Sequence, residues 1–152
     1  MKIRQMKKFF SKLLILSLLL VMQNASFAQE EQDYKYYYTL GYAELVDGDF
    51  AKSVNVFNKA ISINPEAVEA YIGLGIAYRQ LNQLDKALEA TKKALEYDPS
   101  YYKAYYNLGL TYEQQGKMKE AVKAYSIFYK KVPEAKNIPD LKEKIQRLKN
   151  QT

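Results

Sequence analysis

Residues 68–101 read VEAYIGLGIAYRQLNQLDKALEATKKALEYDPSY, and this stretch predicts two consecutive helices. In its first half, four residues follow the i, i+3, i+4, i+7 spacing that places side chains on one face of a helix: Tyr71, Leu74, Gly75 and Tyr78. Glycine inside a helix costs about 1 kcal/mol relative to alanine, but it suits a place where a second helix must approach closely. Asn82-Gln83 interrupts the pattern. Asp98-Pro99 ends the second helix, because the residue before a proline is pushed out of the α region.

The same pattern recurs before and after this stretch, so the chain contains three blocks of equal length, 34–67, 68–101 and 102–135. An aromatic residue, a leucine, a glycine and a closing proline align in all three: Tyr37, Leu40, Gly41 and Pro65; Tyr71, Leu74, Gly75 and Pro99; Tyr105, Leu108, Gly109 and Pro133. A helix–turn–helix of this size cannot bury its apolar face alone, so neighbouring blocks must stack. The sequence therefore predicts an all-α fold, an α-α superhelix (solenoid) of three 34-residue repeats.

The period, the Tyr-Leu-Gly-Tyr set and the closing prolines resemble the tetratricopeptide-repeat (TPR) family over 34–135. Block 34–67 departs from the family pattern at Glu44, where a large apolar residue is usual, and at Ser53, where alanine is usual. Block 68–101 departs at Thr91, which stands at a usually aromatic position. The resemblance implies a superhelix whose concave groove is lined by the first helix of each block and holds a segment of a partner protein.

The C-terminal residues 136–152 contain Ile138, Leu141, Ile145 and Leu148, spaced as one apolar stripe of a helix. Pro139 suits the first turn of such a helix. Because the last repeat of a solenoid needs a cover for its exposed face, we expect residues 136–152 to form a capping helix and tail. A free helix that binds a partner is the alternative.

The first 28 residues have the three parts of a secretory signal peptide. A basic stretch is followed by an apolar run, Leu13 to Met22, and then by Ser26-Phe27-Ala28 with its small residues at the expected places. We expect cleavage after Ala28, a short linker at 29–33, and a periplasmic or secreted protein without a stable membrane anchor. An uncleaved anchor is the alternative, but ten helical residues rise only about 15 Å, roughly half of a hydrocarbon core.

The composition excludes several classes of function. The chain has no Cys and no His, which removes thiolate nucleophiles, Cys–His pairs, catalytic triads and zinc sites. Asp47-Gly48-Asp49 lacks the ligand spacing of a calcium loop, and no Gly-rich phosphate loop is present. We therefore expect no enzyme activity, no cofactor and no metal. The net charge of +6 comes mostly from the leader, so the nearly neutral remainder does not favour nucleic acid.

The candidate site is the stripe that follows the stacking face by one residue on the first helix of each block. It consists of Lys35, Tyr38, Tyr42 and Leu45; Glu69, Ile72, Ile76 and Arg79; and Lys103, Tyr106, Leu110 and Glu113. An apolar strip with a charged rim is typical of a protein-binding surface. We expect these residues to form a partner-binding groove. The alternatives are that they pack against the C-terminal helix or against a second copy of the chain, which would make a homodimer.

Some TPR domains hold a chaperone's C-terminal carboxylate with a clamp of Lys, Asn and Arg. The corresponding positions here are Tyr38, Tyr42, Gly73, Lys103 and Asn107, of which only Lys103 matches, so the clamp is not expected. The function predicted from the sequence is an exported adaptor or scaffold that binds another protein within a cell-envelope assembly. A self-associating structural protein is one alternative. The surplus tyrosines at 36–38 and 101–102 leave a glycan-binding accessory protein of the cell wall as another.

Overall fold

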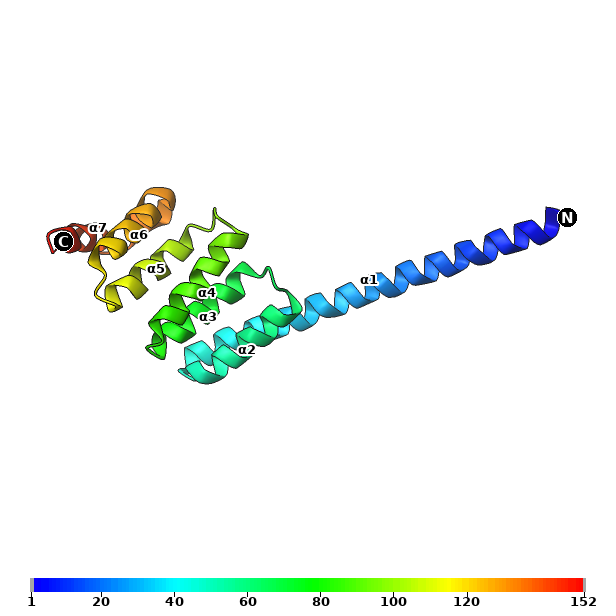
Figure 1. Ribbon diagram of the computed structural model, residues 1–152, viewed down its shortest axis with the longest axis horizontal. Helices are drawn as coiled ribbons and strands as arrows, with labels where there is room; N and C mark the ends of the chain where they lie inside the picture. Colours follow the sequence, from blue (N-terminus) through cyan, green and yellow to red (C-terminus); the bar gives the residue numbers. More distant parts are fainter. Residues whose placement is uncertain (1, 152) are drawn as a thin grey trace.

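The computed structural model describes the backbone of residues 2–151 and the side chains of residues 12–151, and every regular element in that part of the chain is a helix. The elements are α1 (Lys2–Asp47), α2 (Phe50–Ile63), α3 (Val68–Gln80), α4 (Leu84–Tyr97), α5 (Lys103–Gln114), α6 (Met118–Lys131), the 3-10 helix η1 (Pro133–Asn137) and α7 (Leu141–Lys149). Helices α2 to α7 and the last turns of α1 form a stacked array, and the rest of α1 projects away from it (Figure 1).

Each repeat is a pair of helices joined by a tight turn. One residue in each turn has a left-handed backbone, with φ of +82° at Gly48, +58° at Asn82 and +75° at Gly116. Glycine and asparagine tolerate this region better than other residues, so these turns lie where the sequence interrupts the apolar pattern. The extended backbone of Asn64 and Asp98 before each proline ends the second helix. The predicted fold class, an all-α solenoid, is confirmed.

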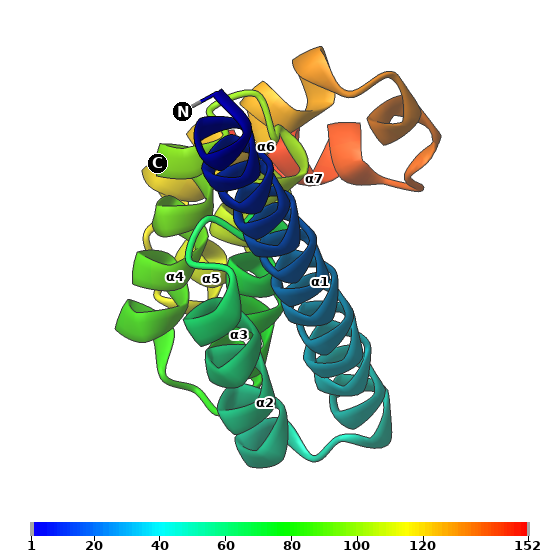
Figure 2. The same ribbon diagram turned by 90° about the vertical axis from the view of Figure 1, so that its right-hand side faces the viewer.

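The array has an inner and an outer layer. Helix α1 contacts α3, and α3 contacts α5, in addition to the contacts between each helix and its neighbours along the chain. Among the described helices, the backbones of α2 and α4, and of α4 and α6, do not come into close contact. The first helices of successive repeats are therefore more closely spaced than the second helices, which curves the array toward α1, α3 and α5. Figure 2 views the array along its long axis, with α1 extending toward the viewer.

Glycines allow the close approach that the sequence predicts. A Cβ atom on Gly109 would lie 2.5 Å from ring carbons of Tyr125, a fully buried side chain of α6. In the first repeat the Phe57 ring fills the corresponding space, and it also contacts Gly73 of the next repeat. One repeat later, Thr91 stands where Phe57 stands and Asn107 stands where Gly73 stands. Between the second and third repeats, the smaller Thr91 and the larger Asn107 thus replace the aromatic ring and the glycine that meet between the first and second repeats.

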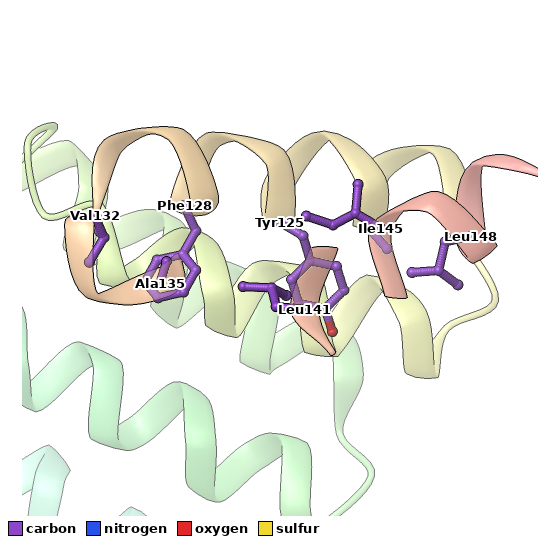
Figure 3. Packing of buried hydrophobic residues seen from close by; sticks show 8 residues of the cluster. Tyr125, Phe128, Val132, Ala135, Leu141, Ile145 and Leu148 are labelled. Carbon is purple, nitrogen blue, oxygen red and sulfur yellow. The ribbon is translucent and has the colours of Figure 1, made fainter. Parts of the chain in front are cut away.

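The C-terminal residues cap the third repeat, as predicted. Leu141, Ile145 and Leu148 of α7 are 2%, 7% and 3% exposed, and they pack with Tyr125 and Phe128 of α6 (Figure 3). The cap begins later than the sequence suggests. Asp140 has a left-handed φ of +61°, so Pro139 precedes the helix and does not occupy its first turn. Ile138 lies outside α7 but still packs against the same cluster.

Helix α1 continues without a break from the leader into the first repeat. Residues 29–33, interpreted from the sequence as a linker, are helical because they contain no Gly or Pro and carry i,i+4 contacts: Gln29 donates to Asp33 at 2.9 Å and Lys35 to Glu31 at 2.6 Å. The apolar side chains from Leu13 to Met22 are all more than half exposed. Among the described residues, this helix alone is long and apolar enough to cross a membrane, a test that an N-terminal signal sequence also passes.

Candidate partner-binding groove

The inner face of the array is built by α1, α3 and α5, and the predicted site residues all lie on these three helices. Each helix contributes one stripe of four, because the repeat places equivalent residues at the same height in successive helices. The three stripes differ in how much of each remains accessible. Exposure therefore separates the residues that a partner could contact from those that hold the array together.

On α1 the stripe forms part of a column of tyrosines. The Tyr38 ring lies 5.8 Å from Tyr34, stacked on it, and 5.1 Å from Tyr42 in an edge-to-face arrangement. Tyr42 packs in turn against Phe57 at 5.1 Å, and its hydroxyl donates to the Glu69 carbonyl oxygen at 3.2 Å. Burial, with a smaller contribution from the Glu69 charge, raises the pKa of Tyr34 to about 12. The Tyr42 hydroxyl, whose pKa is raised mainly by burial, therefore joins the first repeat to the second as a neutral donor.

On α3 the stripe is partly a packing surface. Ile72 is only 5% exposed, because it lies in a cluster with Ala94 and Ala104 against which Tyr101 packs. The sequence predicted Ile72 as part of an exposed strip, and the structure places it in the core instead. Ile76 is half-buried beside the same cluster. Arg79 is also half-buried, and its Nε atom has no hydrogen-bond partner among the described residues.

On α5 the stripe is largely engaged by the chain's own C-terminal elements. Tyr106 lies 5.1 Å from the Phe128 ring and 5.7 Å from the Tyr125 ring, and Leu110 packs against the cluster that contains α7. Glu113 accepts hydrogen bonds from Lys144 of α7 at 2.8 Å and from the Tyr125 hydroxyl at 2.7 Å. Leu110 and Glu113 therefore follow the alternative expectation from the sequence, that residues of the stripe pack against the C-terminal helix.

The Glu113 contacts set its protonation. Burial alone would raise the pKa of the Glu113 carboxyl, but the hydrogen bonds from Lys144 and Tyr125 and the charge of Lys144 outweigh it, so the pKa lies below its usual value. The same arrangement raises the pKa of Tyr125, first through burial and then through its hydrogen bond to the Glu113 carboxylate. Both pKa shifts indicate that Glu113 is an ionised carboxylate and that Tyr125 is a neutral phenol.

A pocket opens at the N-terminal end of α5, where the groove meets the end of α6. Its volume is about 290 Å³, and its lining is mostly apolar: Lys103, Tyr106, Asn107, Phe128, Val132, Glu134, Ala135 and Ile138. Two of the predicted site residues, Lys103 and Tyr106, line it. The stripe does not predict the rest of the lining, because Phe128 comes from the second helix of the repeat and Val132 follows that helix.

The charged members of the stripe differ in their pairing. Lys35 is bound to Glu31 at 2.6 Å, whereas Lys103 and the Glu69 carboxylate form no ion pair among the described residues.

Leu45 is half-buried and packs against the cluster around Phe57. Two further tyrosines, Tyr34 and Tyr101, belong to this face although the stripe omits them. No group of three potential metal-ligating side chains occurs within the described residues.

Comparisons with known proteins agree with this architecture. A family model described as TPR repeat matches residues 41–81 and 75–116, and one described as tetratricopeptide repeat matches residues 103–135. No curated protein gives a significant match. The crystal structure of MamA is 33% identical with a TM-score of 0.60, covering 64% of this chain and 57% of the MamA chain. The present chain thus spans little more than half of MamA.

Two other solved TPR domains cover more of the chain at lower identity. The Arabidopsis OM64 TPR domain is 22% identical with a TM-score of 0.74, covering 81% of this chain and 99% of that domain. The first TPR of Spaghetti (RPAP3), bound to an HSP90 peptide, is 19% identical with a TM-score of 0.71, covering 78% and 92%. The family matches and the stacked helix pairs together show that the chain belongs to the tetratricopeptide-repeat family.

Proposed function

We propose that the chain is an exported adaptor whose inner face binds a segment of a partner protein in a cell-envelope assembly. One observation carries the proposal: the inner face keeps partly exposed apolar side chains, one of which lines an apolar pocket of about 290 Å³ that the other described residues leave open. Tyr38, Ile76 and Tyr106 supply the apolar surface, and Lys103 stands at its rim. Such a combination is typical of surfaces that bind protein segments.

The pocket suits one apolar side chain of the partner, because its volume is at the lower limit of sites for whole small molecules. The solved RPAP3 domain bound to an HSP90 peptide supports the idea that this fold can hold a peptide. The means of recognition must differ here, since Tyr38, Tyr42 and Gly73 stand where a carboxylate clamp would need Lys and Asn. The partner segment is therefore proposed to dock through apolar side chains and not through its terminal carboxylate.

The test compares equivalent changes on the two faces. Tyr38→Ala with Lys103→Glu alters the inner face, and Tyr97→Ala with Lys92→Glu makes the same two changes on α4, in the outer layer. Both proteins are expressed with their leaders, crosslinked in the cell envelope and recovered. A partner that is captured by the unmutated and outer-face proteins but lost with the inner-face variant supports the proposal. Capture that is unchanged by the inner-face variant would show that the groove is not the site.

Export is a separate part of the proposal. The basic, apolar and small-residue segments of the leader support cleavage after Ala28, although the helix itself continues through that point. The intact mass of the protein recovered from cells tests it directly. A mature chain that begins at Gln29 is expected. A chain that keeps residues 1–28 and stays in the membrane fraction would instead favour a retained anchor.

Self-association is a second candidate, favoured by the outward face of α1. Tyr36 is 62% exposed, whereas the equivalent residues of the next two repeats, Ala70 and Ala104, are fully buried against the preceding repeat. Val46 on the same helix is 86% exposed. A second copy stacking there would cover this surface. Light scattering on the mature protein and on a Tyr36→Lys variant decides: a dimer that becomes a monomer supports this candidate, and a monomer in both cases excludes it.

A further inference from the structure

Four tyrosines gather around one carboxylate on the inner face. Tyr34, Tyr38 and Tyr42 form the column on α1, with ring centroids 5.8 Å and 5.1 Å apart, and the Tyr42 hydroxyl is bonded to the backbone of Glu69 on α3. Tyr101, at the end of the second repeat, packs over the core cluster of Ile72 on the same helix. Burial is the main cause that raises the pKa of all four tyrosines, and the Glu69 charge adds to each shift, for Tyr42 after Tyr38 and Tyr101.

The Glu69 carboxylate lies near these rings and has no hydrogen-bond or ion-pair partner among the described residues. Its side chain is exposed, and it accepts no hydrogen bond and joins no ion pair among the described residues. The lysine at the equivalent position of the first repeat, Lys35, is bound to Glu31. The cluster therefore presents a carboxylate that no cation of the described residues neutralises, and the charge of Asp98 also acts on Tyr101.

The rings of the cluster make none of the contacts with lysine that five other tyrosines of the chain make. Elsewhere, lysines lie over the rings of Tyr37, Tyr78, Tyr97, Tyr102 and Tyr125 at 5.2 to 5.7 Å. No lysine or arginine of the described chain lies over Tyr34, Tyr38, Tyr42 or Tyr101. A cation is attracted to the face of such a ring, and a neighbouring carboxylate adds to the attraction. No lysine or arginine of the described chain occupies this site between the tyrosine rings and the carboxylate.

We propose that the four-tyrosine cluster with Glu69 binds a lysine or arginine side chain of the partner segment. This inference rests on the proposed function, because it specifies the residue that the partner places at this end of the groove. Glu69 pairs with the cation, Tyr38 offers its ring, and Tyr42 is held in place by Phe57 and by its bond to the α3 backbone. The charge of Glu69 favours a basic segment over a sugar, since stacking of a neutral ring would not require it.

The test is a selection from a phage-displayed library of random 12-residue peptides on the processed protein. Parallel selections use Glu69→Gln and Glu69→Lys, and circular dichroism confirms that each variant is folded. Enriched peptides should share one position occupied by Lys or Arg. The preference should fade with Glu69→Gln and change to Asp or Glu at that position with Glu69→Lys, because the charge at the site is reversed.

The affinity of a selected peptide for each variant then distinguishes the contribution of the carboxylate from that of the rings. Glu69→Gln should weaken binding about threefold to fivefold, as expected for an exposed ion pair. Tyr38→Leu should weaken it about threefold, whereas Tyr38→Phe, which keeps the ring, should change it less than twofold. Replacing the basic residue of the peptide by Gln should cause a loss similar to that of Glu69→Gln.

The outcomes distinguish the inference from the function on which it rests. Enriched peptides without a shared basic position, or a motif that Glu69→Lys leaves unchanged, would overturn the cation site while keeping a peptide-binding groove. No enrichment of any peptide would overturn both. Binding of soluble cell-wall glycan that is lost with Tyr38→Leu but kept with Glu69→Lys would assign the tyrosines to sugar instead.

Discussion

The two ends of the repeat array meet solvent in different ways. At the C-terminal end, α7 covers the third repeat, and Leu141 and Leu148 are 2% and 3% exposed. At the N-terminal end none of the described residues stacks on the outward face of α1, so Tyr36 remains 62% exposed. The position of Tyr36 is a core position in the next two repeats. Burial of a given repeat position is therefore set by the presence of a neighbour as much as by the residue itself.

The largest effect expected from this contrast is the loss of a cap residue. Leu141→Ala should lower the free energy of unfolding by about 3 kcal/mol, because it removes a buried side chain and leaves a cavity between α6 and α7. The matched change at the open end, Val46→Ala, should alter it by less than about 0.5 kcal/mol. Urea unfolding followed by circular dichroism measures both. Equal and small effects of the two changes would mean that α7 does not dock on the array in solution.

A smaller effect is expected at the helix crossing beside the cap. Gly109→Ala should destabilise the protein by about 1–2 kcal/mol, since its Cβ would lie 2.5 Å from the Tyr125 ring and overpacking outweighs the gain in helix propensity. In a Tyr125→Leu background the same change should become neutral or stabilising. The four proteins form a double-mutant cycle. Additive effects would contradict a direct clash between the Gly109 position and the ring.

Much of the fold could be predicted because the same residue pattern recurs in each repeat. The 34-residue recurrence of Gly and Pro fixed the helix pairs and their turns, and the apolar spacing after residue 136 predicted the cap. The continuity of α1 through residues 29–33 was not predicted. A change in composition was interpreted as a linker, but polar residues without Gly or Pro simply extend the helix.

The candidate site was predicted in outline only. Periodicity placed all twelve residues on α1, α3 and α5, yet it did not predict that Tyr101 and two alanines would pack around Ile72. It also could not foresee that Lys144, from outside the repeats, would reach Glu113. Both depend on contacts between segments far apart in the sequence. The predicted stripe already contained Tyr38, Tyr42 and Glu69, and the surplus tyrosines at 101–102 included Tyr101, the further member of the cluster around Glu69.

The smallest effect concerns ion pairs at the two ends. Lys144→Met removes the partly buried pair with Glu113 and should cost about 0.5–1 kcal/mol at neutral pH. Since the pKa of Glu113 is lowered in the folded state, this contribution is fully present above the ordinary carboxyl pKa of 4.5 and is lost as the pH falls through the lowered value. Unfolding curves of both proteins between pH 3 and pH 7 should therefore converge toward the acid end. The control is Lys35→Met, which removes an exposed pair with Glu31 and should leave the curves superimposed, because solvent screens both partners. A constant gap between the Lys144→Met and unmutated curves down to pH 3 would show that the lysine stabilises the cap through its contact with the Tyr125 ring and not through the carboxylate.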